Sequence, residues 1–125
     1  MSVVDALKAL ADPVRLRMVG LLSEAPVLCS CEIEAILKIN QSNASRHLAR
    51  LRQAGIVNAQ KDGHWVHYTL AQSGPLRSLV EEAVSLARAD DQTFALALDH
   101  LHQYQSSPHT CETIGSWQPG GVVSG

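Results

Sequence analysis

The stretch CSCEIEAILKINQSNASRHLARLRQAGIVNAQKDGHWVHYTL, residues 29–70, decides the fold of this chain. Its first part predicts a short helix over residues 29–38, a tight connection at residues 39–41, and a second helix from residue 42 to about residue 54. Ile33 and Ile36 in the first helix, and Leu48 in the second, recur at helical spacing and are expected to face inward. Gly55 suits the end of the second helix, because glycine tolerates the left-handed backbone found there.

After Gly55 the apolar residues change to a period of two. Val66, Tyr68 and Leu70 are expected on one side of a strand, and Asp62-Gly63 favours a two-residue type I′ turn before it. These signals predict a β-hairpin over residues 56–70. Two helices at turn spacing followed by a hairpin indicate a winged helix-turn-helix, a mainly α fold with one β-hairpin.

Helical patterns flank this unit on both sides. Residues 3–10 form a short amphipathic pattern, and Asp12-Pro13 is a strong start for a second helix, with Asp12 as N-cap. Residues 75–104 are helical again, and Asp90-Asp91 in the middle offers a new cap that would divide this stretch into two helices. So small a domain cannot cover all of these apolar stripes, so we expect a homodimer that pairs through the first and last helices.

Length and composition bound the organisation. The 125 residues, 46% of them hydrophobic, suffice for one domain, expected over residues 1–104. Residues 105–125 turn to Ser, Pro and Gly and are expected to form a flexible tail. The N-terminus lacks the pattern of a secretory signal, and no apolar run approaches the roughly 18 residues of a membrane span, so we expect a cytoplasmic protein.

The charge is unevenly distributed along the chain. The net charge is −2, but residues 29–70 hold five basic and three acidic residues, whereas residues 71–125 hold two basic and six acidic ones. The basic part coincides with the predicted second helix and hairpin, where contacts with DNA phosphates are needed.

The start of the helix over residues 42–54 combines short hydrogen-bonding side chains with cations. Asn and Gln pair with adenine edges, and Arg with guanine edges or phosphates, so this helix end fits a DNA major groove. An exposed polar helix face is the alternative explanation. The predicted DNA-binding residues are Gln41, Ser42, Asn43, Ser45, Arg46, His47, Arg50, Lys61 and His64.

Three cysteines complete the candidate site. In a reducing compartment they are expected to bind metal, sense redox state or simply be buried, rather than form a structural disulfide. Cys29-Ser30-Cys31 is a pair of soft ligands spaced by one residue. Residues two apart on a helix face opposite ways, so we expect that chelation requires the first turn to unwind. Cys111 is either a third ligand or an unengaged thiol in the tail.

Four stretches, residues 9–17, 28–32, 45–55 and 63–68, together resemble the ArsR/SmtB family of metal-responsive repressors, and the arsenic-responsive branch in particular. The resemblance implies a homodimer that binds double-stranded operator DNA when metal-free. It implies release when As(III) or Sb(III), as inducer, binds the Cys-x-Cys site. Some arsenic sensors carry a further cysteine where this chain has Glu34, so a third sulfur here must come from Cys111.

Two alternatives keep the same fold and change the signal. The chain is then either a cadmium or lead sensor, or a thiol-redox or persulfide-responsive repressor in which Cys29 or Cys31 pairs with Cys111. An enzyme is not expected, because the sequence contains no glycine-rich phosphate loop, no Gly-x-Ser-x-Gly and no Cys-x-x-Cys. No catalytic cofactor is expected either.

Overall fold

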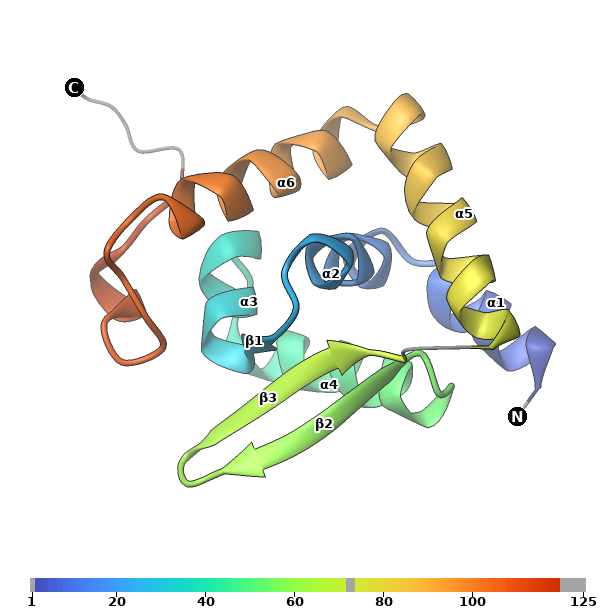
Figure 1. Cartoon of the computed structure of the whole chain (residues 1–125), viewed down its shortest axis with the longest axis horizontal. Coiled ribbons are helices and arrows are strands. Elements are labelled where there is room, and N and C mark those ends of the chain that lie inside the picture. The colour runs from blue at the N-terminus through green and yellow to red at the C-terminus, as the bar shows by residue number, and fades with distance from the viewer. Residues whose placement is uncertain (1, 72–73, 120–125) are drawn as a thin grey trace.

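The computed structural model describes residues 2–71 and 74–119, which form helices around a small antiparallel sheet (Figure 1). In chain order the elements are α1 (Val3–Leu10), α2 (Pro13–Glu24), β1 (Leu28–Cys29), α3 (Ser30–Leu37), α4 (Gln41–Gln53), β2 (Val57–Asp62), β3 (Trp65–Leu70), α5 (Pro75–Asp90), α6 (Gln92–Gln105) and the 3₁₀ turn η1 (Ile114–Ser116). Helix α2 lies at the centre, with α5 and α6 above it and α4 and the β2–β3 hairpin below it in this view. None of the helices described is long and apolar enough to span a membrane.

The helix boundaries follow local capping chemistry. The Asp12 side chain accepts a hydrogen bond from the Arg15 backbone N–H at 3.0 Å, and Asn40 accepts one from the Asn43 N–H at 2.8 Å, which starts α4 one residue earlier than predicted. Asp91 accepts from the N–H groups of Thr93 and Phe94 and so divides the last helical stretch into α5 and α6. Capping by Asp12 is confirmed, and the division at Asp90-Asp91, which the sequence left open, is present.

The sheet has the order β1-β3-β2, with both pairings antiparallel. The hairpin is confirmed, but its turn is shifted by one residue from the prediction. Asp62 pairs with Trp65, so the loop is Gly63-His64 rather than Asp62-Gly63. Gly63 has a φ of 63° and His64 has no positive φ, which excludes the predicted type I′ turn and fits type II′. Strand β1 was not predicted; it is two residues long and pairs Leu28 with Tyr68.

Helix α6 packs closely against α2. Phe94 is fully buried, and its ring lies directly over Gly20, where a Cβ would be 2.5 Å from the Phe94 Cζ. The absence of a side chain at Gly20 therefore lets the two helices approach. This contact anchors the helix that leads to Cys111.

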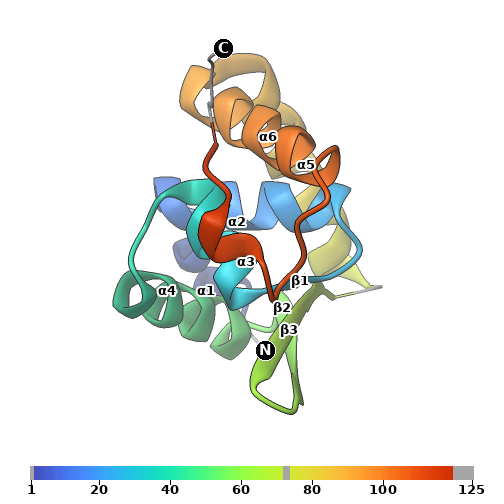
Figure 2. The ribbon, with the colours of Figure 1, turned by 90° about the vertical axis from the view of Figure 1, so that its left-hand side faces the viewer.

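The segment after α6 folds back over α3 (Figure 2). Ile114 is 5% exposed within the hydrophobic core, and Trp117 packs edge-on against Tyr104 with 5.3 Å between ring centroids. Of the predicted tail over residues 105–125, Gln105 is the last residue of α6, and residues 106–119 place Ile114 and Trp117 against the domain. Residues 120–125 of that predicted tail lie outside the described residues.

Candidate thiol site and DNA-reading surface

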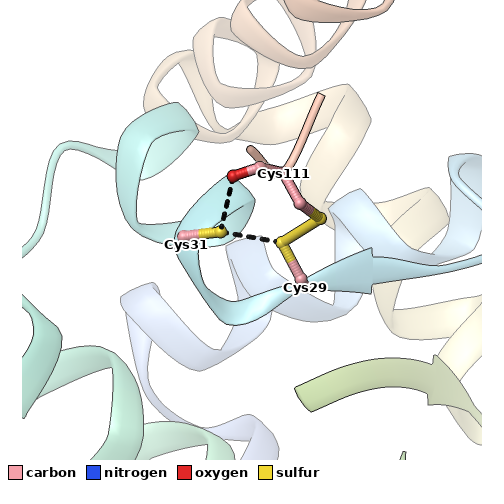
Figure 3. A group of neighbouring side chains, drawn as sticks. All are labelled: Cys29, Cys31 and Cys111. Carbon is pink, nitrogen blue, oxygen red and sulfur yellow. Dashed lines mark hydrogen bonds between the residues drawn. A yellow bond between two sulfur atoms is a disulfide. The ribbon is translucent and has the colours of Figure 1, made fainter. Parts of the chain in front are cut away.

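The three cysteines of the chain meet at the start of α3 (Figure 3). Cys29 Sγ lies 2.9 Å from Cys31 Sγ, and Cys29 forms a disulfide with Cys111, with 6.7 Å between their Cα atoms. All three Sγ atoms lie within 4.8 Å of one another. Cys29 is fully buried, whereas Cys31 and Cys111 are half-buried and accessible to solutes. The sequence singled out the Cys29–Cys31 pair and left the role of Cys111 open. The expectation that the cysteines form no structural disulfide differs from the structure, which has the Cys29–Cys111 pairing considered only for a thiol-redox sensor.

The backbone around Cys29 explains how two cysteines so close in sequence can face each other. Cys29 is the last residue of β1 and the N-cap of α3, with extended φ and ψ of −83° and 163°, and Cys31 is the second helical residue. The prediction that α3 must unwind for the two sulfurs to meet is therefore wrong. The predicted helix began one residue too early, and the opposite-face geometry applies only when both residues are helical.

Glu32 connects this cluster to the rest of the fold. Its carboxylate accepts a hydrogen bond from the Cys29 N–H at 2.8 Å and another from the Tyr104 hydroxyl of α6. Burial, together with the nearby Glu32 carboxylate, raises the pKa of Tyr104 above its ordinary value. Burial and then Glu32 also raise the pKa of the Cys31 thiol, which donates a weak hydrogen bond to the Cys111 carbonyl at 3.7 Å. Cys31 is thus a thiol rather than a thiolate at neutral pH.

An open cavity of about 690 Å³ lies between Cys111 and the β2–β3 hairpin, whereas Cys29 pairs directly with His67 of that hairpin through β1. Thr110 and Cys111 line one side of it, and Trp65 and His67 of β3 line the other. A change at Cys111 therefore takes place opposite the β2–β3 hairpin, the wing of the fold. Neither Glu32 nor Tyr104 was singled out in the sequence, because α3 and α6 are brought together only by the tertiary fold.

Helix α4 presents most of its predicted DNA-binding residues to solvent. Gln41, Ser42, Ser45 and Arg46 are exposed, and Asn43 and Arg50 are half-exposed beside them. The Arg46 guanidinium donates to the Asn43 side-chain oxygen at 2.6 Å. Lys61 and His64 are exposed at the end of the hairpin, so the wing carries polar and basic groups at its tip.

His47 departs from this pattern. Its side chain is 14% exposed and turns inward, where Nδ1 accepts a hydrogen bond from Arg15 at 3.1 Å and lies 3.9 Å from Asp12. Arg15 also donates to the backbone carbonyl of Ala9 at 2.6 Å, at the end of α1. Arg15 thus joins the end of α1 to α4. This link pairs residues 32 positions apart, so no local sequence pattern indicates it. The prediction of a DNA contact from His47 does not fit this inward orientation.

An apolar surface remains uncovered where α1 meets α5. Leu7 is 49% exposed and Leu86 is 70% exposed, and together with Leu16 and Leu79 they line a groove of about 420 Å³. Val3 and Val4 extend the same surface at the start of α1. Exposed apolar surface of this extent typically marks a site of association.

The model for "Bacterial regulatory protein, arsR family" matches residues 12–59, from the cap of α2 into β2. The chain is also 35% identical over 106 residues to the arsenic resistance transcriptional regulator ArsR1 of Pseudomonas putida, an alignment that covers 83% of each protein. The chain belongs to the ArsR family. It is accordingly a DNA-binding transcriptional repressor with a winged-helix fold, and neither the family nor the fold is that of an enzyme.

Solved structures of the ArsR family give the same picture. Reduced HlyU from Vibrio cholerae superposes with a TM-score of 0.60 at 36% identity, covering 72% of this chain and 90% of that one. The AntR antimony-specific transcriptional repressor gives a TM-score of 0.60 at 27% identity, covering 72% of this chain and 80% of its own. The fold expected from residues 29–70 is thereby confirmed.

Proposed function

We propose that this ArsR family member is a homodimer that represses by binding operator DNA in its reduced, metal-free form. Arsenite or antimonite then releases it by binding Cys29, Cys31 and Cys111. The convergence of three sulfurs within 4.8 Å carries this proposal. The similarity to proteins named for arsenic resistance and for antimony supports it.

The sulfur geometry suits one small soft ion. Sulfurs bound to a single ion at about 2.3 Å each cannot be more than about 4.6 Å apart, so the cluster needs little movement to close around it. Trivalent arsenic and antimony take soft thiolate donors, and the three members of this group are all cysteines. Glu34, which stands where a third cysteine might otherwise be, is not part of the group.

Binding is written as an exchange of oxygen for sulfur. Arsenous acid, As(OH)₃, reacts with three thiols, three As–S bonds form, three As–O bonds break, and three waters leave, with no change in oxidation state. The Cys29–Cys111 disulfide must be reduced first, because a disulfide sulfur is not a thiolate ligand. The site is therefore available to the inducer only after a two-electron reductant of thiol class has opened that disulfide, so that all three cysteines are thiols.

Inducer binding connects the start of α3 with the segment after α6, and these two elements lie next to α4 and the β2–β3 hairpin, respectively. Cys29 and Cys31 lie at the start of α3, the helix before α4, and Cys111 lies across a cavity from Trp65 of the wing. An ion holding all three sulfurs favours one arrangement of these elements. It releases DNA to the extent that it binds that arrangement more tightly than the operator-bound one.

Two different surfaces are proposed to bind DNA and to form the dimer. Helix α4 and the β2–β3 hairpin supply the DNA contacts. The predicted dimer interface of the first and last helices is narrowed to α1 and α5, the first half of the last predicted helical stretch, because the exposed apolar groove lies there. Pairing of this surface places two α4 helices on adjacent half-sites. Arg15 and His47 link these surfaces within one subunit, since Arg15 contacts both the end of α1 and α4.

The test uses operator DNA from upstream of the gene that encodes this chain, labelled for fluorescence anisotropy, with the reduced protein. Cys29→Ser with Cys31→Ser is expected to leave operator affinity within about threefold and to abolish release by arsenite. Ser30→Ala, which leaves every sulfur in place, is the matched control and should respond like the wild type. Retained release in the double variant, or loss of operator binding, overturns the site assignment. Cadmium and lead, titrated in parallel, distinguish a divalent-ion sensor.

A thiol-redox response is the second candidate function, and the Cys29–Cys111 disulfide favours it. Oxidation by a two-electron oxidant of peroxide or persulfide class removes two thiols and ties residue 111 to β1. Reduced HlyU, by its name a protein with a defined reduced form, is a structural relative. Release of operator DNA by oxidant, reversed by dithiothreitol and lost in Cys111→Ser, identifies this response. Release by arsenite alone excludes it.

A further inference from the structure

The arginines of this chain differ in whether they have partners. Arg15, Arg46, Arg77 and Arg88 each donate hydrogen bonds to a protein acceptor. Over residues 2–71 and 74–119, Arg17, Arg50 and Arg52 have no side-chain hydrogen bond or ion pair. Arg50 and Arg52 lie on α4, where DNA phosphates supply partners. Arg17 lies on α2 and is half-buried, so a cation without a partner there needs another explanation.

Arg17 lines a small cavity where α2, α3 and α6 meet. The cavity has a volume of about 240 Å³, and Lys38 and His100 line it together with Arg17. Neither of these two side chains has a hydrogen bond or ion pair within the described part of the chain. Among the described lining residues there is no Asp or Glu. Three nitrogen-bearing side chains from three helical elements thus converge with no counter-ion.

The rest of the cavity is apolar. Ile36 is fully buried at its base, and Leu37 and Leu96 line its sides, with Leu96 51% exposed. A hydrated inorganic anion would satisfy the cations but gain nothing from this surface. An alcohol would cover the apolar surface but leave the cations without a partner. A ligand with both an anionic head and a short apolar part satisfies both features.

We infer that this cavity binds a small monocarboxylate with an aliphatic chain, its carboxylate between Arg17, Lys38 and His100 and its chain along Leu37 and Leu96. The volume lies below the roughly 300–1,000 Å³ typical of drug-sized ligands, which limits the ligand to a small metabolite. A guanidinium binds a carboxylate through two parallel hydrogen bonds, so Arg17 is the main anchor.

The location gives the ligand a way to affect DNA binding. Lys38 caps α3 with a left-handed φ of 58°, and it starts the connection that leads to Asn40, the cap of α4. A carboxylate held by Lys38 and His100 ties this connection to α6. The site shares no residue with the cysteine cluster, so its occupancy can be measured whether or not the metalloid proposal holds.

The experiment is isothermal titration of the full-length reduced protein, without DNA or metal, using octanoate, inorganic phosphate and 1-octanol as probes. Octanoate is expected to bind one equivalent per subunit, and Arg17→Gln and Leu96→Ser are each expected to weaken it at least tenfold. Arg77→Gln removes the same charge from α5, outside the cavity, and is expected to leave binding unchanged.

Each other outcome overturns the inference. Absence of octanoate binding, or equal binding by Arg17→Gln and the wild type, removes the site. Phosphate binding as tight as octanoate, with the same loss in Arg17→Gln, indicates an anion site without apolar selectivity. Octanol binding as tight as octanoate indicates an apolar cavity in which the cations take no part. Circular dichroism of each variant establishes that it is folded.

Discussion

Gly20→Ala tests the contact that anchors α6, the helix leading to Cys111. The added Cβ would lie 2.5 Å from Phe94 Cζ and 2.7 Å from Cε2, against an optimal carbon–carbon separation of about 3.5–4.0 Å. Phe94 is fully buried, so its ring has no free space into which to turn. The methyl group therefore forces α2 and α6 apart or moves the ring out of its favoured rotamer.

Two opposing terms set the size of the effect. Overpacking of a core contact costs about 1–3 kcal/mol, and replacing glycine with alanine inside a helix recovers about 1 kcal/mol. Because two ring atoms overlap by about 1 Å, we expect the cost to prevail, with a net loss of about 1–2 kcal/mol. For a chain of this length that corresponds to a fall in Tm of roughly 3–10 °C.

The assay is thermal unfolding of the reduced protein followed by far-UV circular dichroism. Gly115→Ala is the matched control, because no heavy atom lies within 4 Å of its added Cβ. Gly20→Ala combined with Phe94→Leu should be less destabilised than the two single variants added together, by about 1 kcal/mol or more. A Tm for Gly20→Ala at or above that of the wild type, or strict additivity in the double variant, refutes the packing argument.

Three further predictions concern the candidate sites. Cys111→Ser is expected to raise the arsenite concentration for half-release of operator DNA by about 10²–10⁴-fold, because the fold delivers this sulfur to the pair as a tethered ligand; an unchanged titration midpoint would show that two thiols suffice. Leu86→Glu on α5 is expected to raise the dimer Kd at least 100-fold in sedimentation velocity. The control is Leu96→Glu, which changes an exposed leucine on α6 and should leave the dimer Kd unchanged. The same dissociation in both variants would contradict an α1–α5 interface. Burial lowers the pKa of His47, with Arg15 opposing its protonation and Asp12 favouring it. As the pH falls, the unfolded chain therefore binds a proton at His47 before the folded chain does. The free energy of unfolding is expected to fall as the pH drops below about 6.5. The measurement is the urea midpoint of unfolding at several pH values, and His47→Gln should reduce its dependence on pH. A pH profile of the variant that runs parallel to that of the wild type would count against this role of His47.

Features with local causes could be predicted from the sequence. Asp12 followed by Pro13 specifies a helix start through one side chain and one fixed φ angle, and Asp91 divides α5 from α6 by the same chemistry. The hairpin follows from its period of two, although the turn was placed one residue early. Both Asp62-Gly63 and Gly63-His64 fit a tight turn, and cross-strand pairing of Asp62 with Trp65 selects the second.

Features that depend on distant partners could not be predicted. Strand β1 exists because Leu28 and Cys29 pair with β3, and this pairing holds Cys29 outside α3 and turns its sulfur toward Cys31. The nature of the thiol pair was evident from the sequence, whereas its geometry depended on a single residue at a helix boundary. In the same way Ile114 looks like part of a loose tail until α3 provides a surface for it.

Cys29 and Cys111 lie 82 positions apart in the sequence, and this separation has a consequence for gene expression. The ribosome completes the winged helix, which ends at Leu70, well before it adds the last sulfur. A stop codon between residues 106 and 110 would remove that sulfur while keeping α6 and its Phe94 anchor. Such an allele is expected to behave as a super-repressor, dominant over the intact gene and selected against in cells exposed to arsenite, rather than as a null.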